Sequence, residues 1–291
     1  MDRKSFIRSL SLAMASPILT KAETVLNELG KAENTERMPV IFIGHGNPMH
    51  ALHNNKFTQS LTNIQKTISK PKAILVVSAH WLTRGTYVST NPNPKAIYDF
   101  GGFPEEMYKI KYEPLGVPEL AKELKDKITS PKIEADNAMG LDHGAWTVLK
   151  HMYPEANIPT FQLSIDYYKP ASYHFELAKQ LGYLRNKGVL IIGSGNLVHN
   201  LGMVDFANAN GGYDWAVEFD AKAKELLDKG DFKSLIDYEK LGKSAMLSIP
   251  TNDHYLPMIY PLGLSLEKES VSYLYEGMEA GSISMRSFVI K

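Results

Sequence analysis

The chain has 291 residues, a hydrophobic content of 44%, equal numbers of acidic and basic side chains (32 of each) and no cysteine. Its formal net charge of zero leaves no basic field that would hold a nucleic acid or an anionic membrane surface. The missing cysteine excludes disulfides, thiolate metal sites and a cysteine nucleophile, so any metal must be held by histidine, carboxylate or backbone oxygen.

Residues 1–37 form an N-terminal extension that differs from the rest of the chain. Basic residues, including Arg3 and Lys4, precede a short apolar stretch, which resembles a twin-arginine or secretory signal with lysine in place of the second arginine. A disordered or amphipathic extension is an equally good interpretation. We therefore expect a cytoplasmic protein, with export through this segment as the alternative. No stretch of the chain is long and apolar enough to be read as a membrane span.

From Met38 onward, strand-like and helix-like patterns alternate. Apolar runs bounded by glycine or polar residues predict buried strands at 39–43, 72–77, 160–165 and 188–192. Apolar positions at three- and four-residue spacing predict helices at 56–69, 172–185 and 214–228. This alternation predicts one α/β domain over residues 38–291, with a central, mainly parallel or mixed sheet flanked by helices on both faces.

Two stretches, 84–105 and 129–145, are rich in Pro, Gly, Asn and Asp and predict long loops. Long loops in a compact domain are more often functional than idle. We expect them to influence the choice of substrate.

Three histidines, His45, His80 and His199, lie at or just beyond the ends of predicted strands. Ligands of open parallel sheets bind in the crevice beyond the carboxyl ends of the strands, and neutral imidazole is the commonest metal ligand. One histidine in this position is more often structural. Three of them together favour a metal site.

The other histidines give weaker signals. His143 and His254 lie near the starts of predicted helices, where a structural role at the helix end is an equally good interpretation. The other four histidines are predicted to be surface or supporting residues: His50, His53, His151 and His174.

Several familiar catalytic motifs are incomplete or missing. The segment from Gly193 to Val198 contains only two of the three glycines of a dinucleotide-binding fingerprint, because Val198 occupies the third position. The chain has no G-x-S-x-G elbow and no H-E-x-x-H helix. These gaps leave a metal-binding cleft as the best-supported chemistry.

Five motifs, in order along the chain, resemble those of the class III extradiol ring-cleavage dioxygenases, in the branch similar to DOPA 4,5-dioxygenase. They lie at 39–49, 77–81, 140–146, 193–200 and 253–257, so the resemblance covers nearly the whole chain beyond the extension. It implies an α/β fold, a small aromatic diol and dioxygen as substrates, and one divalent metal per chain, Fe(II) for activity or Zn(II) as bound.

Residue by residue, the resemblance implies that His45, His80 and His254 coordinate the metal. It makes His199 the acid–base residue, or a fourth ligand to zinc, and it makes His143 a catalytic residue of the substrate pocket. In the wider class a carboxylate commonly completes the ligand set, whereas here the matching residue is His254.

Three aromatic residues, Trp81, Trp146 and Tyr255, are plausible walls for the substrate ring and equally plausible core residues.

The function implied is cleavage of a DOPA-like catechol to a ring-opened semialdehyde. Two alternatives remain at this stage: a zinc-dependent hydrolase that uses the same histidines to activate water, and a non-catalytic metal-binding protein. The sequence identifies neither the natural catechol nor the oligomeric state.

Overall fold

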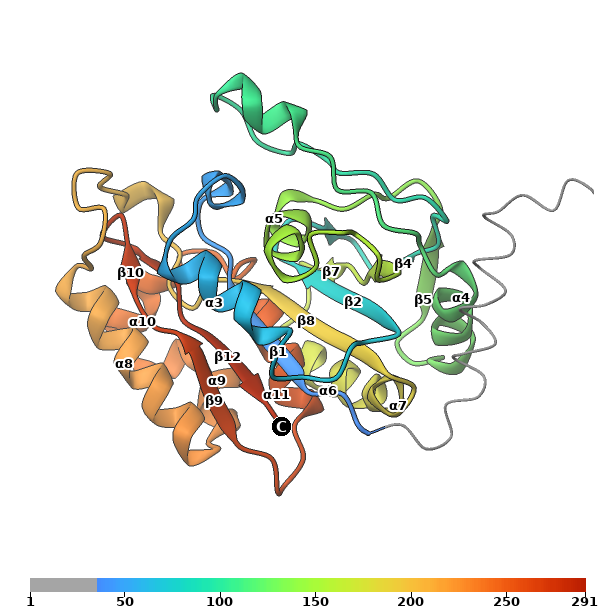
Figure 1. Ribbon diagram of the computed structural model, residues 1–291. Helices are drawn as coiled ribbons and strands as arrows, with labels where there is room; N and C mark the ends of the chain where they lie inside the picture. Colours follow the sequence, from blue (N-terminus) through green and yellow to red (C-terminus); the bar gives the residue numbers. More distant parts are fainter. Residues whose placement is uncertain (1–35) are drawn as a thin grey trace, which may run out of the picture.

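A six-stranded sheet runs through the middle of the computed structural model, which describes residues 36–291 (Figure 1). The order of its strands is β6 (Thr160–Gln162), β2 (Ala73–Ser78), β8 (Val189–Gly195), β1 (Val40–Gly44), β12 (Ser287–Ile290) and β9 (Val271–Tyr275). The first four strands are parallel to one another, whereas β12 and β9 join antiparallel. The predicted mainly parallel, mixed sheet is confirmed.

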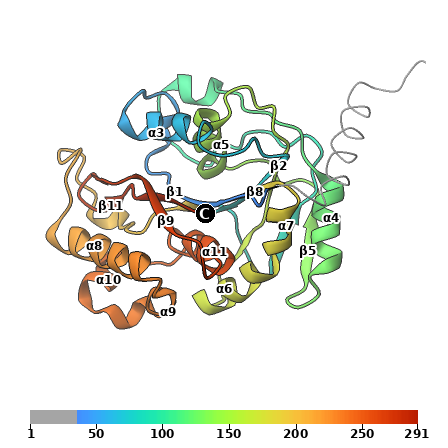
Figure 2. The same cartoon turned by 60° about the horizontal axis from the view of Figure 1, so that its bottom comes forward.

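Helices cover both faces of this sheet (Figure 2). One face packs against α3 (Lys56–Ile64) and α5 (His143–Met152), and the other packs mainly against α6 (Ala171–Gln180), α8 (Asp214–Lys229) and α11 (Leu256–Leu264). Further helices lie around them: α4 (Pro118–Lys127), α7 (Gly182–Asn186), α9 (Phe232–Ile236), α10 (Lys243–Ser248), and the 3-10 helices η1 (Pro48–Ala51), η2 (Glu105–Lys109), η3 (Leu201–Met203) and η4 (Tyr238–Leu241).

The two-sided core explains why the strands lack polar alternation. In β1, Val40 and Phe42 point into one hydrophobic cluster and Ile41 and Ile43 into the other, because successive strand side chains alternate between faces. All four are fully buried. At about 1.5–3 kcal/mol for each large apolar side chain, this burial anchors the strand whose end carries His45.

Some predicted boundaries are wrong. The predicted helix 56–69 ends at Ile64, and the predicted helix 172–185 divides into α6 and α7 at Leu181, before a glycine that is a poor residue for a helix interior. The predicted strand 160–165 ends at Gln162. Its last residue instead begins β7 (Ile165–Asp166), which pairs with β3 (Leu82–Thr83).

The two predicted long loops are also partly structured. Each contains one short strand, and these strands, β4 (Thr86–Ser89) and β5 (Ile133–Asp136), pair in parallel. Their mixed polar and apolar residues gave no continuous apolar run by which to recognise them. A further small pair consists of β10 (Met278–Glu279) and β11 (Ile283–Ser284).

The predicted N-terminal extension lies almost entirely outside the described residues, among which Met38 is the first buried one. The apolar helix α11 is buried along its whole length but has only nine residues. Within residues 36–291, no helix has the length and apolar character needed to cross a membrane.

Candidate metal centre and active site

Five histidines from separate parts of the sequence meet at the carboxyl edge of the parallel strands. His45 directly follows β1, His80 lies two residues beyond β2, and His199 lies four residues beyond β8. His143 is the first residue of α5, and His254 lies just before α11. The convergence that strand topology predicted is present for His45 and His80. His199 lies against His254, which reaches the same edge from a helix start, as does His143.

Three of the five form a group that could hold a metal ion. One ring nitrogen each of His45, His80 and His254 lies within 4.8 Å of the others. The Nε2 atoms of His45 and His80 are 3.2 Å apart. All three side chains are largely buried, with His45 only 3% exposed.

Hydrogen bonds around His45 fix which of its ring nitrogens carries the proton. Its Nδ1 lies 3.0 Å from the hydroxyl of Ser194, and that hydroxyl donates its only hydrogen to the carbonyl oxygen of Gly144 at 2.6 Å. Ser194 can therefore only accept from His45. The proton lies on Nδ1, and the lone pair of Nε2 faces the centre of the group.

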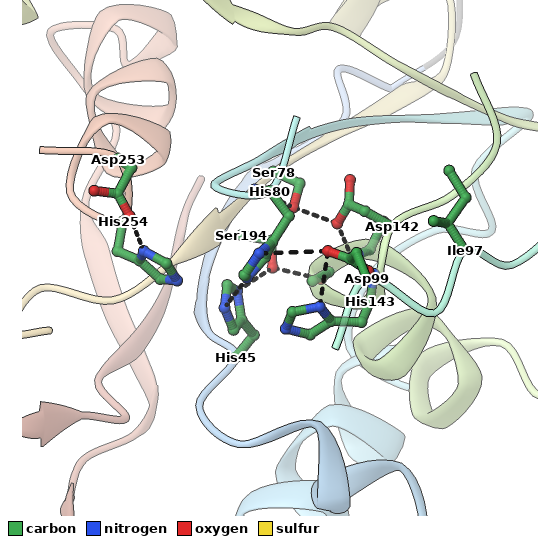
Figure 3. A network of polar contacts seen from close by, with 12 residues as sticks. His45, Ser78, His80, Ile97, Asp99, Asp142, His143, Ser194, Asp253 and His254 are labelled. Carbon is green, nitrogen blue, oxygen red and sulfur yellow. Dashed lines mark hydrogen bonds and ion pairs between the residues drawn. The ribbon is translucent and has the colours of Figure 1, made fainter. Parts of the chain in front are cut away.

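His254 repeats this arrangement with a carboxylate, and His80 has a carboxylate close to the same ring nitrogen. Nδ1 of His80 lies 3.5 Å from Oδ2 of Asp99, and Nδ1 of His254 contacts Oδ2 of Asp253 (Figure 3). A carboxylate accepts hydrogen bonds and does not donate them. Each Nε2 thus keeps its lone pair, as in metal sites whose histidine ligands give their other N–H to an oxygen acceptor.

Burial supports the neutral form of these ligands. Desolvation, followed by repulsion from the neighbouring histidines, lowers the pKa of His45 and of His80 well below 6.5. Three lone pairs directed at one point repel one another unless a cation lies between them. The donor set therefore fits a divalent metal, and three neutral nitrogen ligands suit both Fe(II) and Zn(II).

His143 lies beside this group and is not part of it. Its ring centroid is 3.8 Å from that of His80. Its Nδ1 lies 3.0 Å from Oδ2 of Asp99, and its backbone N–H donates to Oδ1 of the same carboxylate at 2.9 Å. Burial acts to raise the pKa of Asp99, but the hydrogen bond and charge of His143 outweigh it, and the pKa lies below its usual value.

The start of α5 is held by a second carboxylate. Asp142 caps the helix by accepting from the backbone N–H of Ala145, and it also accepts from the hydroxyl of Ser78 at 2.6 Å. Complete burial raises the pKa of Asp142 to about 6. Asp142 is thus the N-cap of α5, and it fixes the position from which His143 projects.

His199 stands on the other side of the metal group. Its ring stacks on that of His254, and it groups with Asp253 and His254 and not with the remaining two ligands. Burial and the neighbouring His254 lower the pKa of His199 to about 3, so the ring is neutral at physiological pH. A neutral, partly exposed imidazole beside the metal position is suited to accept a proton.

Glycines allow the backbone to bring these residues together. A Cβ on Gly195 would lie 2.2 Å from the carbonyl oxygen of His254, and a Cβ on Gly193 would lie 2.1 Å from that of Pro257. The two glycines that resembled part of a dinucleotide fingerprint thus let His254 and the first turn of α11 pack directly on β8. A Cβ on Gly144 would lie 2.9 Å from the ring of His80.

The aromatic residues predicted as pocket walls lie mostly in the core. Tyr255 is 1% exposed, and its hydroxyl donates to the carbonyl oxygen of Leu235. Trp146 is fully buried, and its indole N–H donates to the carbonyl oxygen of Ile97. Trp81 is also buried, at 7% exposure. The ring that reaches the site is Phe100, whose centroid is 5.5 Å from that of His143.

Among the other histidines, the prediction for His174 is wrong. It is fully buried in α6, where its Nδ1 is hydrogen-bonded to the hydroxyl of Tyr260, so it is neither a surface residue nor part of the site. His50 is buried and paired with Glu279, and His151 contacts the backbone carbonyl of His50.

Sequence reasoning missed four residues that hold the histidines: Ser78, Asp99, Ser194 and Asp253. Ser78, Ser194 and Asp253 lie inside three of the five motifs, and Asp99 lies in a loop predicted to be functional. Their roles depend on contacts between distant segments, such as the 44 residues that separate Asp99 from His143.

Fold and site together define a metal-dependent α/β enzyme. Residues 38–284 match the family described as the catalytic LigB subunit of aromatic ring-opening dioxygenase. The chain is 42% identical over 264 residues to "4,5-DOPA dioxygenase extradiol" of Escherichia coli K12, covering 88% of this chain and 96% of that protein. It is 34% identical to the protein of the same name from Beta vulgaris, and the match covers 89% of this chain and 98% of that protein.

The fold has a match among solved structures. The crystal structure of an uncharacterized Escherichia coli K12 protein, 39% identical in sequence, matches with a TM-score of 0.77 and covers 88% of this chain and all of that chain. The protein belongs to the LigB family. It is thus an aromatic ring-opening dioxygenase of the class III extradiol type that the five motifs predicted.

Proposed function

We propose that this protein opens the ring of a DOPA-like catechol with dioxygen, using Fe(II) held by His45, His80 and His254. The observation that carries the proposal is the convergence of three histidines, each with an oxygen atom close to its Nδ1, so that its Nε2 lone pair faces the centre of the group. The substrate class is supported by similarity to relatives named for extradiol cleavage of DOPA. The product would be a ring-opened semialdehyde.

When bound, the ion would lower the pKa of the catechol hydroxyls, and it would allow electron transfer from the electron-rich ring to dioxygen. Three neutral ligands leave its double positive charge uncompensated by the protein. That charge favours an anionic catecholate over a neutral aromatic ligand.

His199 would act as the acid–base residue. A neutral ring at physiological pH has one nitrogen free to accept a catechol proton, which the same nitrogen later returns to the product. Stacking on His254 holds this ring beside the metal position. The arrangement supports this role better than that of a fourth ligand, because His199 does not group with His45 and His80.

His143 would orient the substrate. With Nδ1 directed at Asp99, its Nε2 is the nitrogen left to face the substrate oxygens. Oriented in this way, Nε2 of His143 would form a hydrogen bond with a substrate oxygen, with the Asp99 carboxylate behind the ring. Phe100 beside it offers an aromatic edge to the substrate ring.

The test is oxygen consumption by protein loaded anaerobically with Fe(II) and then mixed with DOPA, with catechol that lacks the amino-acid side chain, and with a monophenol as the matched control. We expect oxygen uptake and a yellow semialdehyde from the diols only, and none from Zn(II)-loaded protein. If no diol consumes oxygen at full iron occupancy, the proposed reaction is wrong. Hydrolysis of an ester or amide by the zinc form, without oxygen, would instead establish a hydrolase.

A further inference from the structure

One carboxylate, that of Asp99, contacts two imidazoles of the site. Its Oδ2 is 3.0 Å from Nδ1 of His143 and 3.5 Å from Nδ1 of His80. Figure 3 shows Asp99 beside the two neighbouring rings, with a dashed line to each. The same side chain therefore contacts a residue of the metal group and the residue assigned to the substrate.

The position of Asp99 is fixed from both sides. Its Oδ1 accepts the backbone N–H of His143 at 2.9 Å, so the carboxylate is tied to the start of α5. Two backbone hydrogen bonds join the segment before Asp99 to Leu141. The N–H of Ile97 donates to the carbonyl oxygen of Leu141 at 2.7 Å, and the N–H of Leu141 donates to the carbonyl oxygen of Lys95 at 2.8 Å. The carboxylate is thus held in place before any ligand arrives.

We propose that Asp99 is a positioning residue that fixes the tautomer and orientation of His80 and His143 together. A carboxylate oxygen 3.0 Å from Nδ1 of His143 and 3.5 Å from Nδ1 of His80 favours a proton on these nitrogens by charge attraction. Nε2 of His80 then stays unprotonated and directed at the metal group. The inference rests on the proposed roles of His80 and His143 and deepens them, since neither homology nor the motifs assigned a role to Asp99.

The other two ligands do not share this dependence. His45 has Ser194 and His254 has Asp253 as acceptors of their own. Within residues 36–291, Asp99 provides the carboxylate that lies near Nδ1 of His80, at an ion-pair distance of 3.5 Å. Because the rings of His80 and His143 are only 3.8 Å apart, the loss of this carboxylate would release two neighbouring imidazoles at once.

The substitution that separates positioning from simple structural support is Asp99→Asn. The amide has the same shape but presents an NH₂ group in place of one oxygen. If the amide oxygen keeps the bond to the backbone of His143, the NH₂ group faces the imidazole Nδ1 atoms and favours the tautomer with the proton on Nε2. In the opposite orientation, the NH₂ group meets the backbone N–H, so one pair of donors always clashes.

A positioning role therefore predicts an unusual order of effects. Asp99→Ala removes the acceptor but lets water take its place, whereas Asp99→Asn actively favours the wrong tautomer of His80. We expect Zn(II) affinity, measured by competition with a chromophoric chelator, to fall about 10- to 100-fold in Asp99→Asn and less in Asp99→Ala. The matched control is Glu105→Gln, an exposed carboxylate of the same segment, paired only with Lys109, which should leave affinity unchanged.

A second measurement reads the tautomers directly. Long-range ¹H–¹⁵N correlation spectra of the metal-free protein should show Nδ1 protonated in His80 and His143, and Asp99→Asn should move the proton of His80 to Nε2. These experiments need neither catechol nor dioxygen, so failure of ring cleavage and failure of this inference are distinguishable.

Unchanged tautomers in Asp99→Asn, or a larger loss of affinity in Asp99→Ala than in Asp99→Asn, would overturn the proposal. If Asp99→Ala does not fold, the Zn(II) affinity and the His80 tautomer of Asp99→Asn, compared with those of the unsubstituted protein, still test the proposal.

Discussion

The imidazole rings of His199 and His254 stack face to face, with centroids 3.4 Å apart and planes inclined by 8°. The backbone N–H of His199 donates to the carbonyl oxygen of Ser248 at 2.9 Å, and a β-bridge to Ile283 holds the same residue from the other side. His199 is therefore fixed beside the ligand group by its backbone and by its ring. The orientation of His254 has an independent support in Asp253.

Replacing His199 with alanine should remove turnover and leave the metal bound. His254 retains its contact with Asp253 in this variant, so the three Nε2 atoms still converge. Loss of an acid–base residue costs roughly 10²- to 10⁴-fold in rate, and we expect kcat to fall by that factor with metal content close to that of the unsubstituted protein. The measurements are oxygen uptake and metal analysis of the same samples.

The matched variant for this experiment is His254→Ala, which should lose both metal and turnover. If His199→Ala loses as much metal as His254→Ala, then His199 is a fourth ligand and the acid–base assignment is wrong.

Placing a methyl group on Gly195 should displace His254. In Gly195→Ala the new Cβ would lie 2.2 Å from the carbonyl oxygen of His254, a backbone atom that can move only with the segment before α11. Overpacking of this kind costs about 1–3 kcal/mol in stability, and the shift of His254 should weaken metal binding as well. Urea unfolding and metal titration measure the two effects.

Gly182→Ala is the control for this substitution, because a Cβ on Gly182 meets no atom within 4 Å. It should leave metal affinity unchanged and should not reduce stability. Equal metal affinity in Gly195→Ala and Gly182→Ala would contradict the role of Gly195 in placing His254.

The strand pattern alone predicted that His45, His80 and His199 lie at one edge of the sheet. Continuous apolar runs locate parallel strands, and the ends of such strands meet at the same edge. His254 could not be found in this way, because it precedes a helix. Its approach to the site depends on small residues in β8, which allow a contact between segments that are far apart in sequence.

The aromatic residues show why the choice between pocket wall and core stayed open in the sequence. Successive residues of a helical turn point about 100° apart, so Tyr255 faces the core although the adjacent His254 faces the site. Asp99 gave no periodic signal, because a single carboxylate in a loop becomes informative only when its distant partners are known. The five motifs did identify the histidines, since family resemblance carries information about packing that residue patterns lack.

Buried His174 should make the protein less stable in acid. Burial lowers its pKa to about 4 in the folded protein, from 6.5 for the free side chain. Between these values the unfolded chain binds a proton that the folded chain does not, so stability falls as pH falls from 6.5 to about 4. At about 1.4 kcal/mol per pKa unit, the loss approaches roughly 3 kcal/mol.

The free energy of unfolding measured against pH, with chelator present throughout, tests this expectation. His174→Gln retains a group that can accept from the Tyr260 hydroxyl and has no proton to gain, so its stability should depend less steeply on pH below 6.5. Parallel curves for the two proteins would show that His174 does not contribute to acid sensitivity.

Removing the metal should lower the stability of the protein, because the three Nε2 lone pairs then face one another without a cation. Any ion that binds only the folded state stabilises it by mass action, by about 2.7 kcal/mol at a free concentration of 100 times Kd. We expect Tm to fall on treatment with chelator and to recover with either Fe(II) or Zn(II), because the donor set suits both.

His80→Ala should abolish the dependence of Tm on metal, since two remaining nitrogens do not complete the site. Glu105→Gln, far more exposed than any ligand, should retain it. A metal-dependent Tm that persists in His80→Ala would place the stabilising ion elsewhere in the chain.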